Sequence, residues 1–304
     1  MFQYLAYGLK IESLIEFPEL YPMHFHGEAD VYVYVSFDTW NAIKEPVVVS
    51  AEKQLDEDSL YYKLTVKDIA DYVVFGGKFI SITLLKAHKM EAVRLYCLSN
   101  AFAAVLYQRG MIPLHASGVI VDGGVAMFLG SSGAGKSTLL LYLKSKGIPI
   151  FSDDVCVPSI DEASRDVQMR ASYPMIKCWL STLELLQIGF EKKHRLQDGM
   201  DKFGVFFHRD FDSRALSPKY LFFLEKSDNN DTVSIQPITG VEVFSRLVAQ
   251  AYRGQHFRER VHKQILFDVY TKISVQSTAF VISRPNGIDS IDAVGKKVIE
   301  QIVM

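Results

Sequence analysis

The residues best suited to chemistry form a glycine-rich stretch near the middle of the chain. Residues 130–137 read Gly-Ser-Ser-Gly-Ala-Gly-Lys-Ser, which fits the pattern GxxxxGK[ST]. The glycines let backbone N–H groups turn toward a phosphate, Lys136 adds a positive charge, and the Ser137 hydroxyl can ligate Mg²⁺. A strand-like run, Val125 to Leu129, precedes the stretch, and a helix-like run, Thr138 to Leu143, follows it. The sequence therefore predicts a loop that binds the phosphates of a nucleoside triphosphate.

Two adjacent acids, Asp153 and Asp154, end the strand-like run that follows the loop and its helix. Because successive side chains on a strand point to opposite faces, we expect only one of them to face the terminal phosphate directly. Phosphoryl transfer needs Mg²⁺ on the phosphate oxygens, a cation, and often a carboxylate that receives the acceptor's proton. We assign Asp153 as the catalytic base and Asp154, with Ser137, as metal support. The alternative is that the pair only ends a strand or caps a turn.

Other titratable residues are weaker candidates. His115 begins a strand-like run before the loop, and the hairpin predicted between them returns it to the same sheet edge. A histidine at such a position is a candidate catalytic residue, with a hydrogen-bonded structural role as the alternative. The basic residues that could supply a second cation are Lys177, Lys202, Arg253 and Arg284, each of which could equally be solvated or salt-bridged.

Composition limits the remaining function classes. The chain has 304 residues, a formal net charge of −2 and three cysteines without CxxC spacing. The nearly balanced charge gives no reason to expect a nucleic-acid or membrane partner, and the cysteines suit buried, reduced thiols. No basic leader and no long apolar run is present, so we expect a cytoplasmic protein, with a homo-oligomer left open. The guanine-binding, transporter-ATPase and ordinary protein-kinase signatures are also missing from the sequence.

The elements that must position these residues fall into two parts. Residues 1–88 carry short strand-like pieces with Val/Tyr alternation in Val31 to Val35, which predicts a smaller β-rich N-terminal domain. Residues 89–304 begin with a helical pattern from Glu91 to Arg109 and continue with a hairpin turned at Asp122-Gly123. A terminal helix is expected from Asp289 to Ile302. The fold class is therefore α/β or α+β, with a P-loop domain at 89–304.

Two polar segments, Glu191 to Asp212 and Gly254 to Lys263, are expected to be mobile loops.

Three motifs in their order resemble the catalytic domain of HPr kinase/phosphorylase, a bacterial serine kinase whose loop domain is similar to phosphoenolpyruvate carboxykinase. They are Leu114 to Gly118, the loop 130–137, and Ser152 to Val155. The resemblance implies a nucleotide-phosphate role for the loop, a base role for Asp153 and a place beside the transferred phosphate for His115. The residues expected to bind ATP are Gly130, Ser131, Ser132, Gly133, Ala134, Gly135, Lys136, Ser137 and Thr138, the last standing where that family carries Glu.

Shorter motifs narrow this resemblance. Tyr7 to Ile11, Phe17 to Leu20, Gln108 to His115 and Tyr173 to Lys177 are similar to HPr-kinase homologues encoded beside lasso-peptide genes. Members of that group phosphorylate the C-terminal serine of a precursor peptide. We therefore expect an ATP- and Mg²⁺-dependent serine kinase with a peptide or protein acceptor. A small-molecule hydroxyl kinase on the same scaffold and a non-catalytic ATP-sensing module remain the alternatives.

Overall fold

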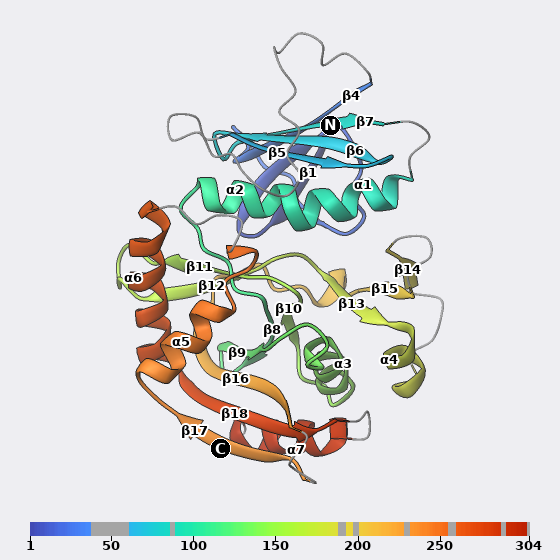
Figure 1. Ribbon diagram of the computed structural model, residues 1–304. Coiled ribbons are helices and arrows are strands. Elements are labelled where there is room, and N and C mark those ends of the chain that lie inside the picture. Colours follow the sequence, from blue (N-terminus) through green and yellow to red (C-terminus); the bar gives the residue numbers. More distant parts are fainter. Residues whose placement is uncertain are drawn as a thin grey trace.

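Two large β-sheets with helices between and around them make up the chain (Figure 1). The computed structural model describes residues 1–37, 61–85, 89–187, 193–196, 201–227, 232–254, 260–286 and 290–302. Among the helices of these ranges, none combines the length and the apolar character that a membrane crossing needs. The expected mixed α/β class is confirmed.

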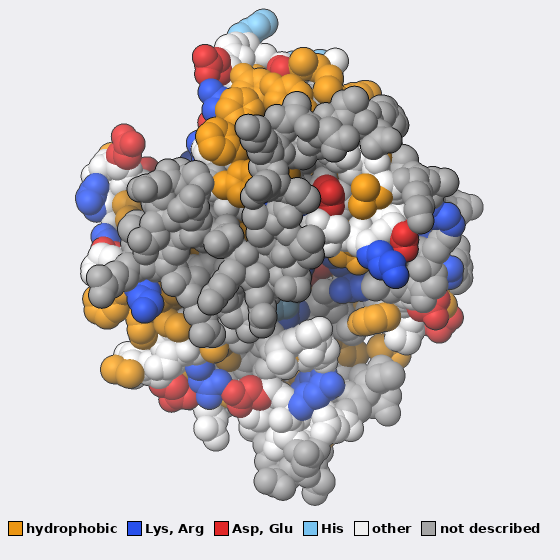
Figure 2. Space-filling view, turned by 45° about the horizontal axis from the view of Figure 1, so that its top comes forward, with side chains coloured by type: hydrophobic (Ala, Val, Ile, Leu, Met, Phe, Trp, Pro, Cys, Tyr) orange, Lys and Arg blue, Asp and Glu red, His pale blue; other side chains and the backbone are white. Residues whose placement is uncertain are grey.

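The N-terminal sheet has seven strands in the order β3-β1-β2-β4-β7-β6-β5. Val31 and Val33 of β4 are buried and Val35 is partly buried, while Tyr34 is exposed, as the alternating pattern predicts. In Figure 2, hydrophobic side chains gather at the top of the face, and Tyr34, Phe75 and Phe79 of this sheet are among the exposed large hydrophobic residues. The strands are β1 (Phe2–Ala6), β2 (Leu9–Ser13), β3 (Tyr21–Pro22), β4 (Val31–Phe37), β5 (Tyr61–Val66), β6 (Ala70–Phe75) and β7 (Phe79–Leu84).

A helical segment lies between the N-terminal sheet and the rest of the chain (Figure 1). It consists of α1 (Met90–Tyr96), a π-helical stretch (Cys97–Ala101) and α2 (Phe102–Gln108). The predicted helix is therefore present, but a π-helical stretch interrupts it, which apolar spacing alone does not reveal. Gly110 follows with φ +70°, the left-handed conformation expected after a helix end.

The second sheet has the order β10-β8-β9-β16-β18-β17, and the glycine-rich residues 130–137 follow its strand β9. β8 (Ala116–Val121) and β9 (Gly124–Leu129) form the predicted hairpin, with Asp122 and Gly123 both at positive φ in its turn. All of β9 is buried, because Val125, Met127 and Leu129 pack into one core cluster while Ala126 and Phe128 pack into the other. The remaining strands are β10 (Ile150–Ser152), β16 (Ser217–Ser227), β17 (Ser234–Ile238) and β18 (Thr278–Pro285).

Helices and short strands cover the second sheet (Figure 1). On one side α3 (Lys136–Ser145) packs with α7 (Ile291–Ile302). The other helices are α4 (Leu180–Leu185), α5 (Val241–Ala249) and α6 (Arg260–Gln276). Two small sheets complete the fold, one of β11 (Cys156–Ile160) and β12 (Val167–Ala171), the other of β13 (Met175–Trp179), β15 (Lys202–Phe206) and β14 (Lys193–Arg195).

The two segments expected to be loops have a different outcome. The polar stretch 191–212 contains β14 and β15, so the prediction of a loop is wrong for these residues. Pairing of β15 with β13 outweighs the polar composition of the flanking sequence. Of the second segment, residues 255–259 lie outside the described residues, and α6 begins at Arg260.

The boundary expected after residue 88 follows residues 86–88, which also lie outside the described residues. One hydrophobic cluster contains Val31 and Ile80 of the N-terminal sheet together with Val125 and Met127 of the second sheet.

Tyr7, in the turn between β1 and β2, ties the N-terminal sheet to the second half of the chain. Its backbone N–H donates to the Ser172 carbonyl (2.9 Å) and its hydroxyl donates to the Leu98 carbonyl (2.8 Å). Its ring stacks on Phe102 and meets Tyr173 edge-on, with centroids 5.2 and 5.7 Å apart. Tyr7 is 1% exposed, so the side chain of this turn packs inside the core.

Replacing Tyr7 should separate the contribution of its ring from that of its hydroxyl. We expect Tyr7→Ala to lower the free energy of unfolding by about 3–4 kcal/mol, because a buried aromatic ring leaves a cavity. Tyr7→Phe keeps the ring and should cost only about 1 kcal/mol for the lost hydrogen bond. Urea titration of both variants measures this. Equal losses in the two variants would contradict a stabilising role for the packing of the Tyr7 ring.

Candidate active site

A cavity of about 140 Å³ opens where the loop after β9 meets α3, β10 and β13. The loop needs glycine here: Gly130 has φ +148°, and a Cβ on it would lie 2.6 Å from the Leu224 carbonyl oxygen. Gly135, with φ +101°, directly precedes α3, so Lys136 and Ser137 are the first residues of the helix. The cavity is lined by His115, Ser117, Ser132, Gly133, Gly135, Lys136, Ser137, Thr138, Asp153, Asp154, Lys177, Cys178, Trp179, Thr182 and Lys202.

The ammonium of Lys136 is held inside the loop. It donates to the Gly130 carbonyl (2.7 Å) and lies 3.1 Å from Nε2 of His115. Burial lowers the pKa of Lys136, and the charges of Asp153 and Asp154 oppose that shift. Because an ammonium can only donate, Nε2 of His115 accepts, which places the imidazole proton on Nδ1.

Asp153 is 1% exposed and accepts three kinds of donor. The Ser117 hydroxyl donates to Oδ1 (2.6 Å), the Ser137 hydroxyl lies 3.1 and 3.2 Å from the two oxygens, and the Lys177 backbone N–H donates to Oδ2 (2.8 Å). Burial, and next the charge of Asp154, raise the pKa of Asp153, while these donors work against that rise. Asp153 is therefore a buried carboxylate that accepts a hydrogen bond from the Ser137 hydroxyl, the group expected to ligate the metal.

Asp154 has a different environment. Its carboxylate lies 2.8 Å from Nζ of Lys177 and 3.4 Å from Nδ1 of His115, and that nitrogen is 3.1 Å from its carbonyl oxygen. Burial alone would raise the pKa of Asp154, but Lys177 and then His115 together hold it well below its usual value. Asp154 has φ +69°, a conformation that Asp tolerates better than most residues.

These contacts differ from the roles expected for the two acids, Asp153 as the catalytic base and Asp154 as metal support. Ser137 and Asp154 are expected together at the metal, whereas in the structure the Ser137 hydroxyl donates to Asp153 and Asp154 faces His115 and Lys177. Strand alternation does not decide the question, because Asp154 lies after the end of β10 and has left-handed backbone geometry.

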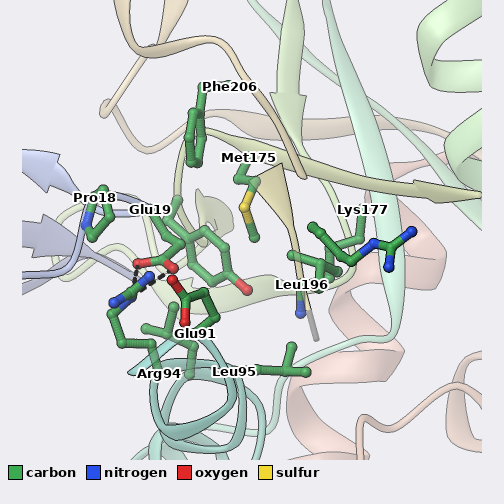
Figure 3. Close-up of a pocket in the computed structure, with 12 residues that line it drawn as sticks. Pro18, Glu19, Glu91, Arg94, Leu95, Met175, Lys177, Leu196 and Phe206 are labelled. Carbon is green, nitrogen blue, oxygen red and sulfur yellow. Dashed lines mark hydrogen bonds and ion pairs between the residues drawn. The ribbon is translucent and has the colours of Figure 1, made fainter. Parts of the chain in front are cut away.

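Lys177 also faces the N-terminal half of the molecule. It lines the phosphate cavity and, on its other side, the crevice drawn in Figure 3. In that crevice Nε of Arg94, on α1, donates to both carboxylate oxygens of Glu19 at 2.9 and 3.1 Å. Nζ of Lys177 also lies 5.7 Å from the ring centroid of Tyr173. The ring contacted by Tyr7 therefore supports the lysine that pairs with Asp154.

The four basic residues considered as a second cation separate into two groups. Lys177 and Lys202 line the phosphate cavity. Arg284 instead donates to the Ala134 carbonyl at 2.9 and 3.1 Å and supports the loop backbone, and Arg253 donates to the Ser99 carbonyl.

The sequence patterns do not identify Ser117, Tyr173, Trp179 and Thr182 as site residues. Ser117 and Tyr173 lie within the motifs Leu114 to Gly118 and Tyr173 to Lys177, which could have identified them, whereas Trp179 and Thr182 lie in no such motif.

Comparison of the sequence with protein-family models and with curated proteins finds no match. Among solved structures, the Hpr(Ser) kinase/phosphatase from Coxiella burnetii is similar over 62% of this chain and 95% of its own length. The two share 11% sequence identity, with a TM-score of 0.31.

The buried ion pair should dominate the response of stability to Asp154→Asn. With side chains 8% and 22% exposed, Lys177 and Asp154 form a pair whose disruption leaves an uncompensated ammonium. We expect the free energy of unfolding to fall by about 3 kcal/mol at pH 7, and Asp154→Asn combined with Lys177→Met to restore most of it.

The pH dependence of that loss follows from the two pKa shifts. The pKa of folded Asp154 is lowered, so its stabilisation is present above the unfolded value of about 3.9 and is lost as the pH falls. Burial alone would lower the pKa of Lys177, but Asp154 raises it well above its usual value, so that contribution persists up to at least about pH 10. Urea titrations should show the full difference near neutral pH and a smaller one below about pH 4. The difference should also shrink at alkaline pH, because the Lys177 ammonium left unpaired in Asp154→Asn then loses its proton. A difference unchanged at pH 3 would contradict the pairing.

Proposed function

We propose that the chain is a nucleoside-triphosphate-dependent phosphotransferase that moves the terminal phosphoryl group of ATP to a hydroxyl. One observation carries the proposal: the first residues of a helix after a glycine loop, Lys136 and Ser137, share one cavity with two carboxylates in contrasting environments. Backbone N–H groups at such a helix start bind phosphate, and carboxylates of different basicity suit metal support and proton transfer.

Oxygen donors beside the loop fit Mg²⁺. The Ser137 hydroxyl can offer a lone pair to the ion while donating its proton to Asp153, a hard-oxygen arrangement that magnesium accepts together with phosphates and water. When bound there, Mg²⁺ would neutralise charge on the phosphate oxygens. We therefore place Asp153 on the metal side, as support of Ser137.

Asp154 is then the carboxylate that receives the proton of the acceptor hydroxyl. The acceptor oxygen forms a bond to phosphorus, the bond from phosphorus to the ADP oxygen breaks, and the acceptor proton passes to Asp154. His115 and Lys177 orient that carboxylate. The lowered pKa of Asp154 makes it a weak base, which suits a loose transition state in which orientation matters more than basicity. Lys136 neutralises charge on the transferred group.

The acceptor that the sequence favours is a peptide serine. The motif order His115, loop, Asp153-Asp154 is similar to a serine kinase family, and the shorter motifs at Tyr7 and Tyr173 are similar to homologues that modify the C-terminal serine of lasso precursor peptides. In the structure these two tyrosines contact each other behind Lys177, so the motifs belong to the surroundings of the same site.

The test is mass spectrometry of precursor peptides encoded beside the gene after incubation with the protein, ATP and Mg²⁺. We expect one added phosphate on a serine with the wild type and none with Lys136→Ala or Asp154→Asn. Free serine and other small hydroxyl compounds serve as competing acceptors. Transfer to these but to no peptide would leave a small-molecule kinase, and ATP binding without any transfer would leave a sensor module.

The division between the acids is tested by comparing Asp153→Asn with Asp154→Asn. If Asp153 supports the metal, Asp153→Asn raises the Mg²⁺ concentration for half-maximal ATP binding by about tenfold or more, whereas Asp154→Asn leaves it within about twofold and lowers kcat by at least about 100-fold. Calorimetric titration and single-turnover kinetics measure the two quantities. The reverse result would restore Asp153 as base and Asp154 as metal support.

A further inference from the structure

A second cavity, of about 290 Å³, adjoins the phosphate cavity. The two share Gly133, Gly135, Thr138, Trp179 and Thr182 on their rims. The acidic pair and His115 line only the phosphate cavity, whereas residues of α7 and β16 line only the second. The two cavities are therefore continuous along the glycine loop, and a triphosphate whose terminal group faced the acids would have room to extend into the second one.

The walls of the second cavity are mostly apolar. Leu139 of α3, Leu224 of β16 and Val294 of α7 are buried residues that line it, with Ile291 and Leu185 beside them. Walls of this kind with a few polar groups at the edge are typical of sites for flat heterocycles.

Polar groups lie along the border between the cavities. The hydroxyl groups of Thr138 and Thr182 are 3.1 Å apart, and the guanidinium of Arg284 lies against the loop, where its Nη2 would be 3.3 Å from a Cβ on Gly135. Lys226 lines the same cavity from the end of β16. The two threonine hydroxyls therefore lie on the border between the cavities, while Arg284 and Lys226 add positive charge to the wall of the second cavity.

Trp179 is a large hydrophobic residue that remains exposed next to both cavities. It ends β13, is 52% exposed, and lines both cavities. Nζ of Lys202 lies 5.7 Å from the centroid of its ring. A large aromatic side chain left open at the junction of a phosphate site and an apolar cavity provides a stacking surface for a base.

We propose that the second cavity binds the nucleoside of the nucleotide, with the base stacked on Trp179 and its far side against α7. The proposal rests on the proposed function, since it needs a nucleotide whose phosphates occupy the loop. It extends the nucleotide site beyond residues 130–138 and makes Trp179 a ligand-contacting residue.

Fluorescence provides a direct test, because the chain has two tryptophans. In a Trp40→Phe background the emission comes from Trp179 alone. Mg²⁺–ADP should change that emission, whereas Mg²⁺–tripolyphosphate, which has no base, should bind in competition with ADP and change it little. Trp179→Leu should weaken ADP binding about tenfold and leave tripolyphosphate binding within about twofold. Trp179→Phe should restore most of the ADP affinity, which excludes misfolding as the cause.

The outcomes separate a failure of the nucleoside site from a failure of the proposed phosphotransferase function. If Trp179→Leu weakens both ligands equally, or leaves ADP binding unchanged, the nucleoside lies elsewhere and the inference is overturned. If neither ADP nor tripolyphosphate binds the wild type, or if Lys136→Ala binds both as well as the wild type, the phosphate-loop function itself fails.

Discussion

Lys177 is the residue on which the arrangement of the acids depends. Its backbone N–H donates to Asp153 and its ammonium pairs with Asp154, each at 2.8 Å, so one position on β13 fixes both carboxylates. The ion pair also offsets the cost of burying either charge, since an isolated ammonium or carboxylate in this environment would change its protonation state. Neighbouring carboxylates would otherwise repel each other, and the lysine keeps Asp154 ionised next to a second acid.

This dependence extends into the N-terminal half of the chain. Tyr7 packs on Tyr173, whose ring supports the Lys177 ammonium, and the Tyr7 N–H binds Ser172. The Ser172 hydroxyl in turn donates to the Asp153 carbonyl at 3.2 Å. The N-terminal sheet thus contacts the active site through buried side chains and one backbone hydrogen bond. Residues before the phosphate loop therefore contribute to the position of the acids without lining the phosphate cavity.

The parts of this site that the sequence predicts are those encoded over short distances. The loop 130–137 and the turn at Asp122-Gly123 need particular residue types at fixed spacing, so their patterns are readable. Contacts of Asp154 with Lys177, and the exposure of Trp179, depend on where β13 packs, which no local pattern specifies. The same reason explains why β15 is missed: its pairing with β13, and not its own composition, makes it a strand.

Charge balance in the cavity shows what the proposed binding of a triphosphate would need beyond the loop lysine. Two carboxylates, Asp153 and Asp154, and three ammonium groups, Lys136, Lys177 and Lys202, line the cavity, so their charges nearly cancel before any ligand enters. A triphosphate adds several negative charges, and the Lys177 ammonium is already committed to Asp154. Backbone N–H groups at the start of α3 and the Lys202 ammonium balance part of the added charge. In the proposed function the remaining charge would be matched by a cation that arrives with the nucleotide, and Asp153 and the Ser137 hydroxyl provide oxygen atoms for it beside the loop.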